Sequence, residues 1–208
     1  MKVTWIGHSC FKIDKDGYTI VFDPYEDDSV PGLAPVREKA DEALCSHDHF
    51  DHGAVEVLEL TNKGDSPFTV TTIDTYHDDT NGSERGPNRI HILDDGETKV
   101  IHLGDLGCEL EPDQLNMIRG ADVVMIPVGG FYTIDAAQAA DLVKEIRPRI
   151  VIPMHYRDDL MGFGFDVIGT VEDFMDQVED ATILPESSID STDDLPTQVI
   201  VLRPQNAG

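Results

Sequence analysis

The segment His47-Asp48-His49-Phe50-Asp51-His52 carries the strongest structural signal in this chain. It follows an apolar stretch at residues 42–45 that we expect to be a short strand, so His47 and His49 leave an extended backbone on the same side. Three imidazoles and the carboxylate of Asp51 form a nitrogen and oxygen ligand set that suits Zn²⁺ and similar divalent ions. The HxHxDH pattern therefore predicts a metal-binding loop at the end of a strand.

Strand and helix patterns follow one another on both sides of this loop. We expect strands at residues 3–6, 11–14, 18–22, 42–45, 68–73, 89–93, 98–103, 123–127, 150–153 and 198–202. We expect helices at residues 53–61, 111–119, 136–146 (with Asp135 as N-cap) and 171–178, and a solvated acidic loop at residues 186–195. Because no repeat or linker divides the 208 residues, we expect a single domain over residues 1–208, of the α+β class with two facing sheets and helices outside them.

Charge and composition exclude several classes of function. The chain has 41 acidic and 15 basic side chains, a formal net charge of −26, which disfavours nucleic acids and anionic membrane surfaces as partners. No stretch approaches the roughly 20 apolar residues of a membrane helix, and residues 3–6 are too short for a signal-peptide core. Three widely spaced cysteines without a CxxC pair suit reduced thiols, so we expect a cytoplasmic protein.

Four further segments accompany the histidine loop in a fixed order. They are IVFDP with Asp23, TYHDD with His77, HLGDLG with Asp105 and IPMHY with His155. With HxHxDH, this series resembles the metallo-β-lactamase-fold hydrolases over about residues 1–160. The opening WIGHS and the later PVGGFYTID look most like the branch that includes the L-ascorbate-6-phosphate lactonase and many uncharacterised Zn-dependent hydrolases.

The resemblance implies a four-layer αββα sandwich with two divalent metal ions at one edge of the sheets. It assigns His47, His49 and His77 to the first ion, Asp51, His52 and His155 to the second, and Asp105 to a position between them. Two cations about 3.5–4 Å apart need a bridging anion, which supports a shared carboxylate and hydroxide independently of the family. Zn²⁺ is the expected ion, although Mn²⁺, Fe²⁺ or Ni²⁺ would accept the same ligands.

The expected activity is hydrolysis of a small molecule by a metal-bridging hydroxide, with Asp51 and Asp105 among the catalytic groups. The lactonase-like motifs favour a lactone or carboxylic ester, and the alternative is a phosphodiester of a small phosphorylated substrate. A redox diiron protein is a rival from another class, but the diiron branch has a carboxylate where this chain has His49. A non-catalytic metal-binding module is the other rival. The sequence carries no signature of the substrate or of the oligomeric state.

Several residues near these motifs have two interpretations. His8 in WIGHS either faces the metals, to bind substrate or donate a proton, or is a hydrogen-bonded core histidine. Tyr132 follows a Gly-Gly turn and is a candidate substrate-facing or oxyanion-stabilising group, unless that turn is an ordinary loop. Arg85 and Arg157 either recognise an anionic substrate or pair with nearby aspartates. Asp23 is expected to orient the metal loop rather than bind metal.

Other histidines and the cysteines are expected to be structural. His91 and His102 lie inside predicted strands. Cys10, Cys45 and Cys108 are expected to pack as small apolar side chains, although Cys108 lies only three residues after Asp105.

Overall fold

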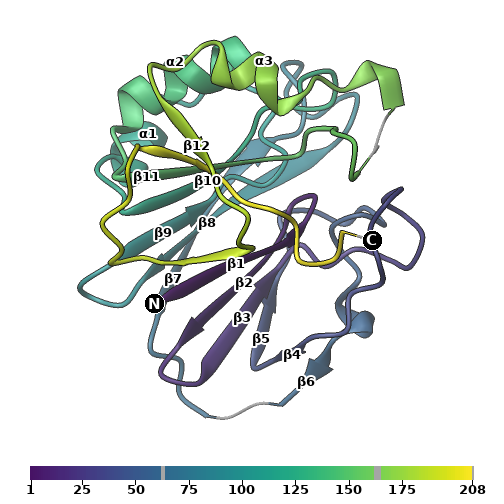
Figure 1. Ribbon diagram of the computed structural model, residues 1–208, viewed down its shortest axis with the longest axis vertical. Coiled ribbons are helices and arrows are strands. Elements are labelled where there is room, and N and C mark those ends of the chain that lie inside the picture. The colour runs from purple at the N-terminus through teal and green to yellow at the C-terminus, as the bar shows by residue number, and fades with distance from the viewer. Residues whose placement is uncertain (62–63, 162–164, 208) are drawn as a thin grey trace.

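Two β-sheets face each other across a shared apolar core in the computed structural model, which describes residues 1–61, 64–161 and 165–207 (Figure 1). The smaller sheet has the order β13-β1-β2-β3-β5, with strands β1 (Lys2–Gly7), β2 (Cys10–Lys15), β3 (Tyr18–Phe22), β5 (Glu42–Leu44) and β13 (Ser188–Asp190). The larger sheet has the order β12-β14-β11-β10-β9-β8-β7, with strands β7 (Thr69–Tyr76), β8 (Pro87–Asp94), β9 (Lys99–His102), β10 (Val123–Pro127), β11 (Ile150–Met154), β12 (Ala181–Ile183) and β14 (Val199–Val201). Two short strands, β4 (Lys39–Ala40) and β6 (Glu59–Leu60), pair with each other.

The α-helices lie over the outer face of the larger sheet, with the smaller sheet on its other side (Figure 1). They are α1 (Pro112–Ile118), α2 (Ala136–Ile146) and α3 (Val171–Met175), and the 3₁₀ turns are η1 (Val55–Val57) and η2 (Phe165–Val167). α2 shows why the sequence forms these helices. Asp135 accepts a hydrogen bond from the Gln138 backbone N–H as N-cap, and Ala139, Val143 and Ile146 are buried at helical spacing. The predicted cap and helix are therefore confirmed.

Strand directions decide where the loops go. β1 and β3 both pair antiparallel with β2, and β5 pairs parallel with β3, so these three strands run the same way. In the larger sheet β7 and β9 both pair antiparallel with β8, and β10 and β11 continue parallel to β9. The loops after β1, β3 and β5 therefore all leave the smaller sheet at the same end of its strands. In the same way, the loops after β7, β9, β10 and β11 all leave the larger sheet at one end of its strands.

Side chains from the two sheets meet in the core next to that edge. The Phe22 ring on β3 stacks on His102 of β9 at 4.8 Å between centroids. His102 Nε2–H donates to the Ser9 carbonyl at 2.8 Å, and its Nδ1 accepts from the Gly104 N–H. His91 interacts with the Cys45 carbonyl at 3.1 Å. Both histidines thus join one sheet to the other, as their expected structural role requires.

Two sequence predictions of local structure are wrong. The helix expected at residues 53–61 is only the 3₁₀ turn η1 followed by β6, because the backbone N–H groups of Glu59 and Thr61 donate to the carbonyls of Glu38 and Ala40 instead of continuing the turn. The acidic loop expected at residues 186–195 contains β13, in which Ile189 is buried opposite Val3 at the edge of β1. A single apolar residue among carboxylates gave too weak a pattern to predict this strand. β4, β6 and β12 were not predicted either.

No helix among the described residues combines the length and apolar character that crossing a membrane requires.

Candidate metal centre

The predicted ligands come together where the strand ends of the two sheets meet. His8, Asp23 and the loop from His47 to His52 follow β1, β3 and β5 of the smaller sheet. His77, Asp105 and His155 follow β7, β9 and β11 of the larger sheet. The topology therefore places residues that are far apart in sequence around one centre. Each sheet contributes three of the segments that surround it.

Left-handed backbone at three of these positions aims the side chains. His8, Asp23 and His155 have φ values of +54°, +42° and +53°, a region that non-glycine residues rarely adopt and that tends to occur at functional sites. The turn at His8 is held by the Trp5 indole N–H, which donates to the His8 carbonyl at 2.8 Å. The Asp23 turn is held by its own N–H, which donates to Leu44 O at 3.1 Å.

The first predicted ligand group is assembled. One ligand atom from each of His47, His49 and His77 lies within 4.8 Å of the others. His77 Nδ1–H donates to the Tyr132 carbonyl at 2.9 Å, which leaves Nε2 for the centre. His47 Nδ1 lies 2.9 Å from Ser46 Oγ; because that hydroxyl donates to Asp23 at 2.6 Å, it accepts from His47.

His47 provides a direct test of whether the group suits a metal. Its Nε2 is buried and has no hydrogen-bond partner within the described ranges. A buried imidazole nitrogen usually has a partner, and a nitrogen whose ring partner already donates its proton presents a lone pair, as a metal ligand does. The residues present therefore fit a divalent cation.

The second group surrounds the carboxylate of Asp105. Asp105 Oδ2 lies 3.2 Å from His52 Nε2 and 3.2 Å from His77 Nε2. It also lies 3.0 Å from His155 Nε2. Asp51 Oδ2 lies 3.6 Å from His52 Nε2. Asp105 thus touches imidazoles from both predicted groups, which is the position of a shared ligand.

His8 faces this centre. It is buried, its Nε2 lies 3.4 Å from Asp51 Oδ2, and a ligand atom of His8, of His52 and of His155 all lie within 4.8 Å of one another. Of the two positions that the sequence left open for His8, the structure places it among the predicted metal ligands rather than in the apolar core.

Asp23 supports the loop as the resemblance implies. Its carboxylate accepts hydrogen bonds from the Ser46 N–H at 2.7 Å and Oγ at 2.6 Å, and from His52 Nδ1–H at 2.8 Å. Burial would raise its pKa, but nearby His102 and His52 outweigh burial and lower the pKa to about 2. Asp23 is therefore ionised at neutral pH and fixes the His52 tautomer with Nε2 directed at Asp105.

The histidines of the centre have pKa values shifted in opposite directions. Burial lowers the pKa of His47 to about 3 and of His8 to about 4, so both are neutral at pH 7. The pKa of His52 is raised well above its ordinary value, because the carboxylates of Asp105 and Asp51 outweigh the effect of burial. The pKa of Asp105 is held well below its ordinary value by His155 and His52, in spite of burial. The carboxylates thus favour positive charge in a buried place, which a bound cation would supply.

A pocket of about 310 Å³ opens onto the centre. Its nine lining residues are His49, Phe50, Asp51, His77, Glu84, Arg85, Asp105, Tyr132 and His155. Arg85 and Tyr132 lie here, as the sequence suggested they could. Arg157 does not line it; its Nε–H donates to the Ile168 carbonyl at 2.6 Å, which is a structural contact.

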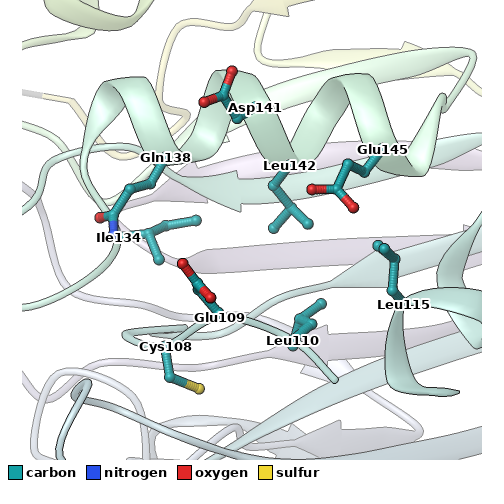
Figure 2. A pocket seen from close by; sticks show the side chains of 9 residues that line it. All are labelled: Cys108, Glu109, Leu110, Leu115, Ile134, Gln138, Asp141, Leu142 and Glu145. Atoms are coloured by element: carbon teal, nitrogen blue, oxygen red, sulfur yellow. The ribbon is translucent and has the colours of Figure 1, made fainter. Parts of the chain in front are cut away.

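Cys108 belongs to a different pocket, between α2 and the segment that follows Asp105 (Figure 2). Glu109, Asp141 and Glu145 supply carboxylates there, and the Cys108 sulfur points away from α2 (Figure 2). Burial raises the pKa of this thiol. Cys108 is thus a half-buried thiol outside the metal pocket, which agrees with its expected packing role.

Sequence reasoning missed three residues that hold the centre in place. Ser46 links Asp23 to His47 as described above. Asn88 Oδ1 accepts from the Asp105 N–H at 2.9 Å, and its Nδ2 donates to the Leu103 carbonyl at 3.0 Å. Gly104 has φ +56°, and a Cβ there would lie 2.4 Å from Asn88 Oδ1 and from Ser46 Cβ. The local sequence carried no signal for Asn88, which stands between Pro87 and Arg89 at the start of β8.

A comparison with known families identifies the superfamily of the chain. The profile of the Beta-lactamase superfamily domain matches residues 2–155. The chain therefore belongs to the β-lactamase superfamily, and the predicted metallo-β-lactamase fold, an α+β sandwich, is confirmed.

Individual relatives indicate the kind of enzyme within this superfamily. A UPF0173 metal-dependent hydrolase of Hyperthermus butylicus is 29% identical over 192 residues, covering 74% of this chain and 82% of the relative. A UPF0173 protein of Pyrococcus furiosus is 30% identical, covering 75% of this chain and 83% of the relative. A Thermotoga maritima crystal structure, described as a candidate Zn-dependent hydrolase of the metallo-β-lactamase superfamily, is 28% identical with a TM-score of 0.74 and covers 97% of each chain. Together with the family match, these similarities identify the chain as a metal-dependent hydrolase of that superfamily, which is the activity that the Hyperthermus butylicus relative's name states.

Proposed function

We propose that this protein holds two divalent metal ions, Zn²⁺ by preference, and hydrolyses a lactone or carboxylic ester of a small molecule. His47, His49 and His77 would hold one ion, and Asp51, His52 and His155 the other, with Asp105 shared. The observation that carries this proposal is the position of Asp105 Oδ2, within 3.2 Å of imidazoles from both groups. When bound, such ions make a nucleophile from water at neutral pH and polarise the bond to be cleaved.

The chain's own residues would bind the substrate and move the proton. His8 is neutral and 3.4 Å from Asp51, so this pair can take the proton that water loses as its oxygen attacks the carbonyl carbon. When the carbon–oxygen bond to the leaving group breaks, His8 can return that proton to the leaving oxygen. The Tyr132 side chain lines the pocket, where its hydroxyl can donate to the carbonyl oxygen as negative charge develops.

The size of the pocket and the charge of the chain support a small-molecule substrate. A volume of about 310 Å³ is at the lower end for small-molecule sites, which are about 300–1,000 Å³. The net charge of −26 opposes the binding of nucleic acid.

Cys10, Cys45 and Cys108 are free thiols, which supports the proposal of a reducing, cytoplasmic location.

A substrate panel with metal analysis tests the proposal. Metal content would be measured by elemental analysis on the protein as purified and again after loading with Zn²⁺ or Mn²⁺. Turnover would then be measured on lactones, carboxylic esters and phosphodiesters. We expect two ions per chain and turnover of lactones or esters. Turnover of phosphodiesters alone would overturn the assigned bond type. Full metal content without any turnover would indicate a binding module, and stoichiometric iron with O₂ consumption would indicate a redox protein.

A further inference from the structure

Arg85 stands out in the lining of the pocket beside the candidate metal centre because of the charges around it. It is the one arginine or lysine among the nine lining residues, in a chain with only 15 such side chains. Its neighbours in the lining include the carboxylates of Asp51, Glu84 and Asp105. The acidic surface already makes the chain soluble, so solubility does not explain a cation at this position. A role in binding a ligand does.

The loop that carries Arg85 is fixed by a buried carboxylate. Asp78, directly after the predicted ligand His77, is 2% exposed. Its Oδ1 accepts from the backbone N–H groups of Thr80 and Gly82 at 2.9 and 2.8 Å, and its Oδ2 accepts from the N–H groups of Glu84 and Arg85 at 3.1 and 2.8 Å. The backbone of Arg85 is therefore held relative to the metal centre rather than free on a surface loop.

Two aromatic rings from another loop hold the guanidinium. Its Cζ lies 5.7 Å from the Phe131 ring centroid and 5.6 Å from the Tyr132 centroid, within the range of cation–π attraction. That loop is also tied to the centre, because the Tyr132 carbonyl accepts from His77 Nδ1–H. A guanidinium that rests on aromatic rings keeps N–H groups available for a planar, two-point interaction with an oxyanion.

Exposed apolar surface adjoins this cation. The Phe50 side chain lines the same pocket and is 55% exposed, and Phe131 is 59% exposed. The backbone under Phe50 is held, since its carbonyl accepts from the Glu26 N–H at 2.8 Å. An exposed phenyl ring on a held backbone beside this pocket can cover an apolar part of a substrate.

We propose that Arg85 is the specificity-determining residue of this site, and that it selects esters or lactones whose apolar or aryl portion carries a single carboxylate. The proposal rests on the proposed hydrolase function and names its substrate class. A monoanion matches one guanidinium. A phosphate dianion would bring a second negative charge towards Glu84, whose Oε2 already lies 3.5 Å from Arg85 Nη1.

Three matched aryl acetates test the substrate class. They are para-acetoxybenzoate, its neutral amide para-acetoxybenzamide, and para-acetoxyphenyl phosphate, which share the reacting bond. With the metal-loaded protein we expect kcat/KM to be about tenfold higher for the carboxylate than for the amide, the size of one charge-assisted hydrogen bond at a half-exposed site (about 1.4 kcal/mol). The phosphate should not exceed the carboxylate; a clear preference for the phosphate would overturn the monoanion assignment.

Variants of Arg85 assign the preference to this residue. R85Q should lower kcat/KM for the carboxylate ester about tenfold more than for the amide, mainly through KM. R85K, which keeps the charge but loses the planar fork, should restore part of the difference. R89Q is the matched control, because Arg89 lies on β8, is exposed and does not line the pocket. If R85Q keeps the wild-type preference, or R89Q loses it equally, the proposal is wrong.

Product binding separates this proposal from the proposed function. Calorimetric titration of para-hydroxybenzoate and para-hydroxybenzamide into the metal-loaded wild type and R85Q makes the same comparison without any hydrolysis. If the wild type hydrolyses no ester but prefers para-hydroxybenzoate in an Arg85-dependent way, the binding assignment holds and the hydrolase function fails. If both products bind equally, the Arg85 proposal fails whatever the turnover.

Discussion

Replacing Asp105 by Asn tests the shared-ligand role most directly, because one side chain touches both predicted metal groups. The substitution keeps the shape of the side chain and removes one charge that is 1% exposed. A divalent ion about 4 Å from a single negative charge gains about 8 kcal/mol at an effective dielectric constant of about 20. Part of this is retained by the amide oxygen, and part is offset by the lost hydration of the ion. We therefore expect D105N to weaken metal binding by about 3 kcal/mol, or roughly 100-fold.

The assay for D105N is metal affinity, measured by competition with a chelator of known strength, with elemental analysis of the loaded protein and circular dichroism to check the fold. Turnover should be lost together with the metal. D113N is the matched control, since Asp113 is an exposed carboxylate in the first turn of α1 and the change in charge is the same. Metal affinity within threefold of the wild type in D105N would refute the shared-ligand role.

Three further predictions follow from the contacts of the centre. Metal affinity should rise with pH through and above neutrality. The pKa of His52 is raised in the metal-free protein, and the extra proton on its ring must leave before metal binds. Calorimetry in buffers of different ionisation enthalpy should therefore detect proton release at pH 7, and the absence of proton release would contradict this reasoning. D23N should lower metal affinity about 10–100-fold without removing a ligand, since it weakens the bonds that orient His52 and Ser46; chelator competition measures this, and wild-type affinity would count against the supporting role. G104A should lower the free energy of unfolding by about 1–3 kcal/mol more than G96A, as measured by urea denaturation. Both glycines have positive φ, but of the two only Gly104 has other atoms within 4 Å of an added Cβ. Equal losses in the two variants would show that backbone conformation, not crowding, limits this site.

The sequence predicted the parts of this molecule that repeat a regular pattern or a compact motif. The buried strands at Val123–Pro127 and Ile150–Met154 are continuous apolar runs, and the HxHxDH loop concentrates four of the predicted ligands in six residues. Strand β13 escaped prediction because a single buried residue, Ile189, specifies it through pairing with β1. Such pairing is non-local, and local patterns do not encode it.

The geometry of the site shows the same division. The ligand types could be identified in the sequence, but the resemblance was needed to group His77, Asp105 and His155 with the loop. What local patterns could not provide is the supporting set. Ser46 and Asn88 act through hydrogen bonds to atoms distant in sequence, and no spacing rule predicts them.

Charge and distance together explain how so acidic a chain could act on an anion. The repulsion from a net charge of −26 comes mostly from exposed carboxylates, and salt screens it beyond about 8–10 Å. The proposed metal ions would add four positive charges at a buried centre where screening is weak, and Arg85 adds one more in the lining of the adjoining pocket. Close to the reacting bond, these charges would outweigh the distant ones. The surface would then affect mainly how fast an anionic substrate arrives, whereas the centre and Arg85 would decide how tightly it is held.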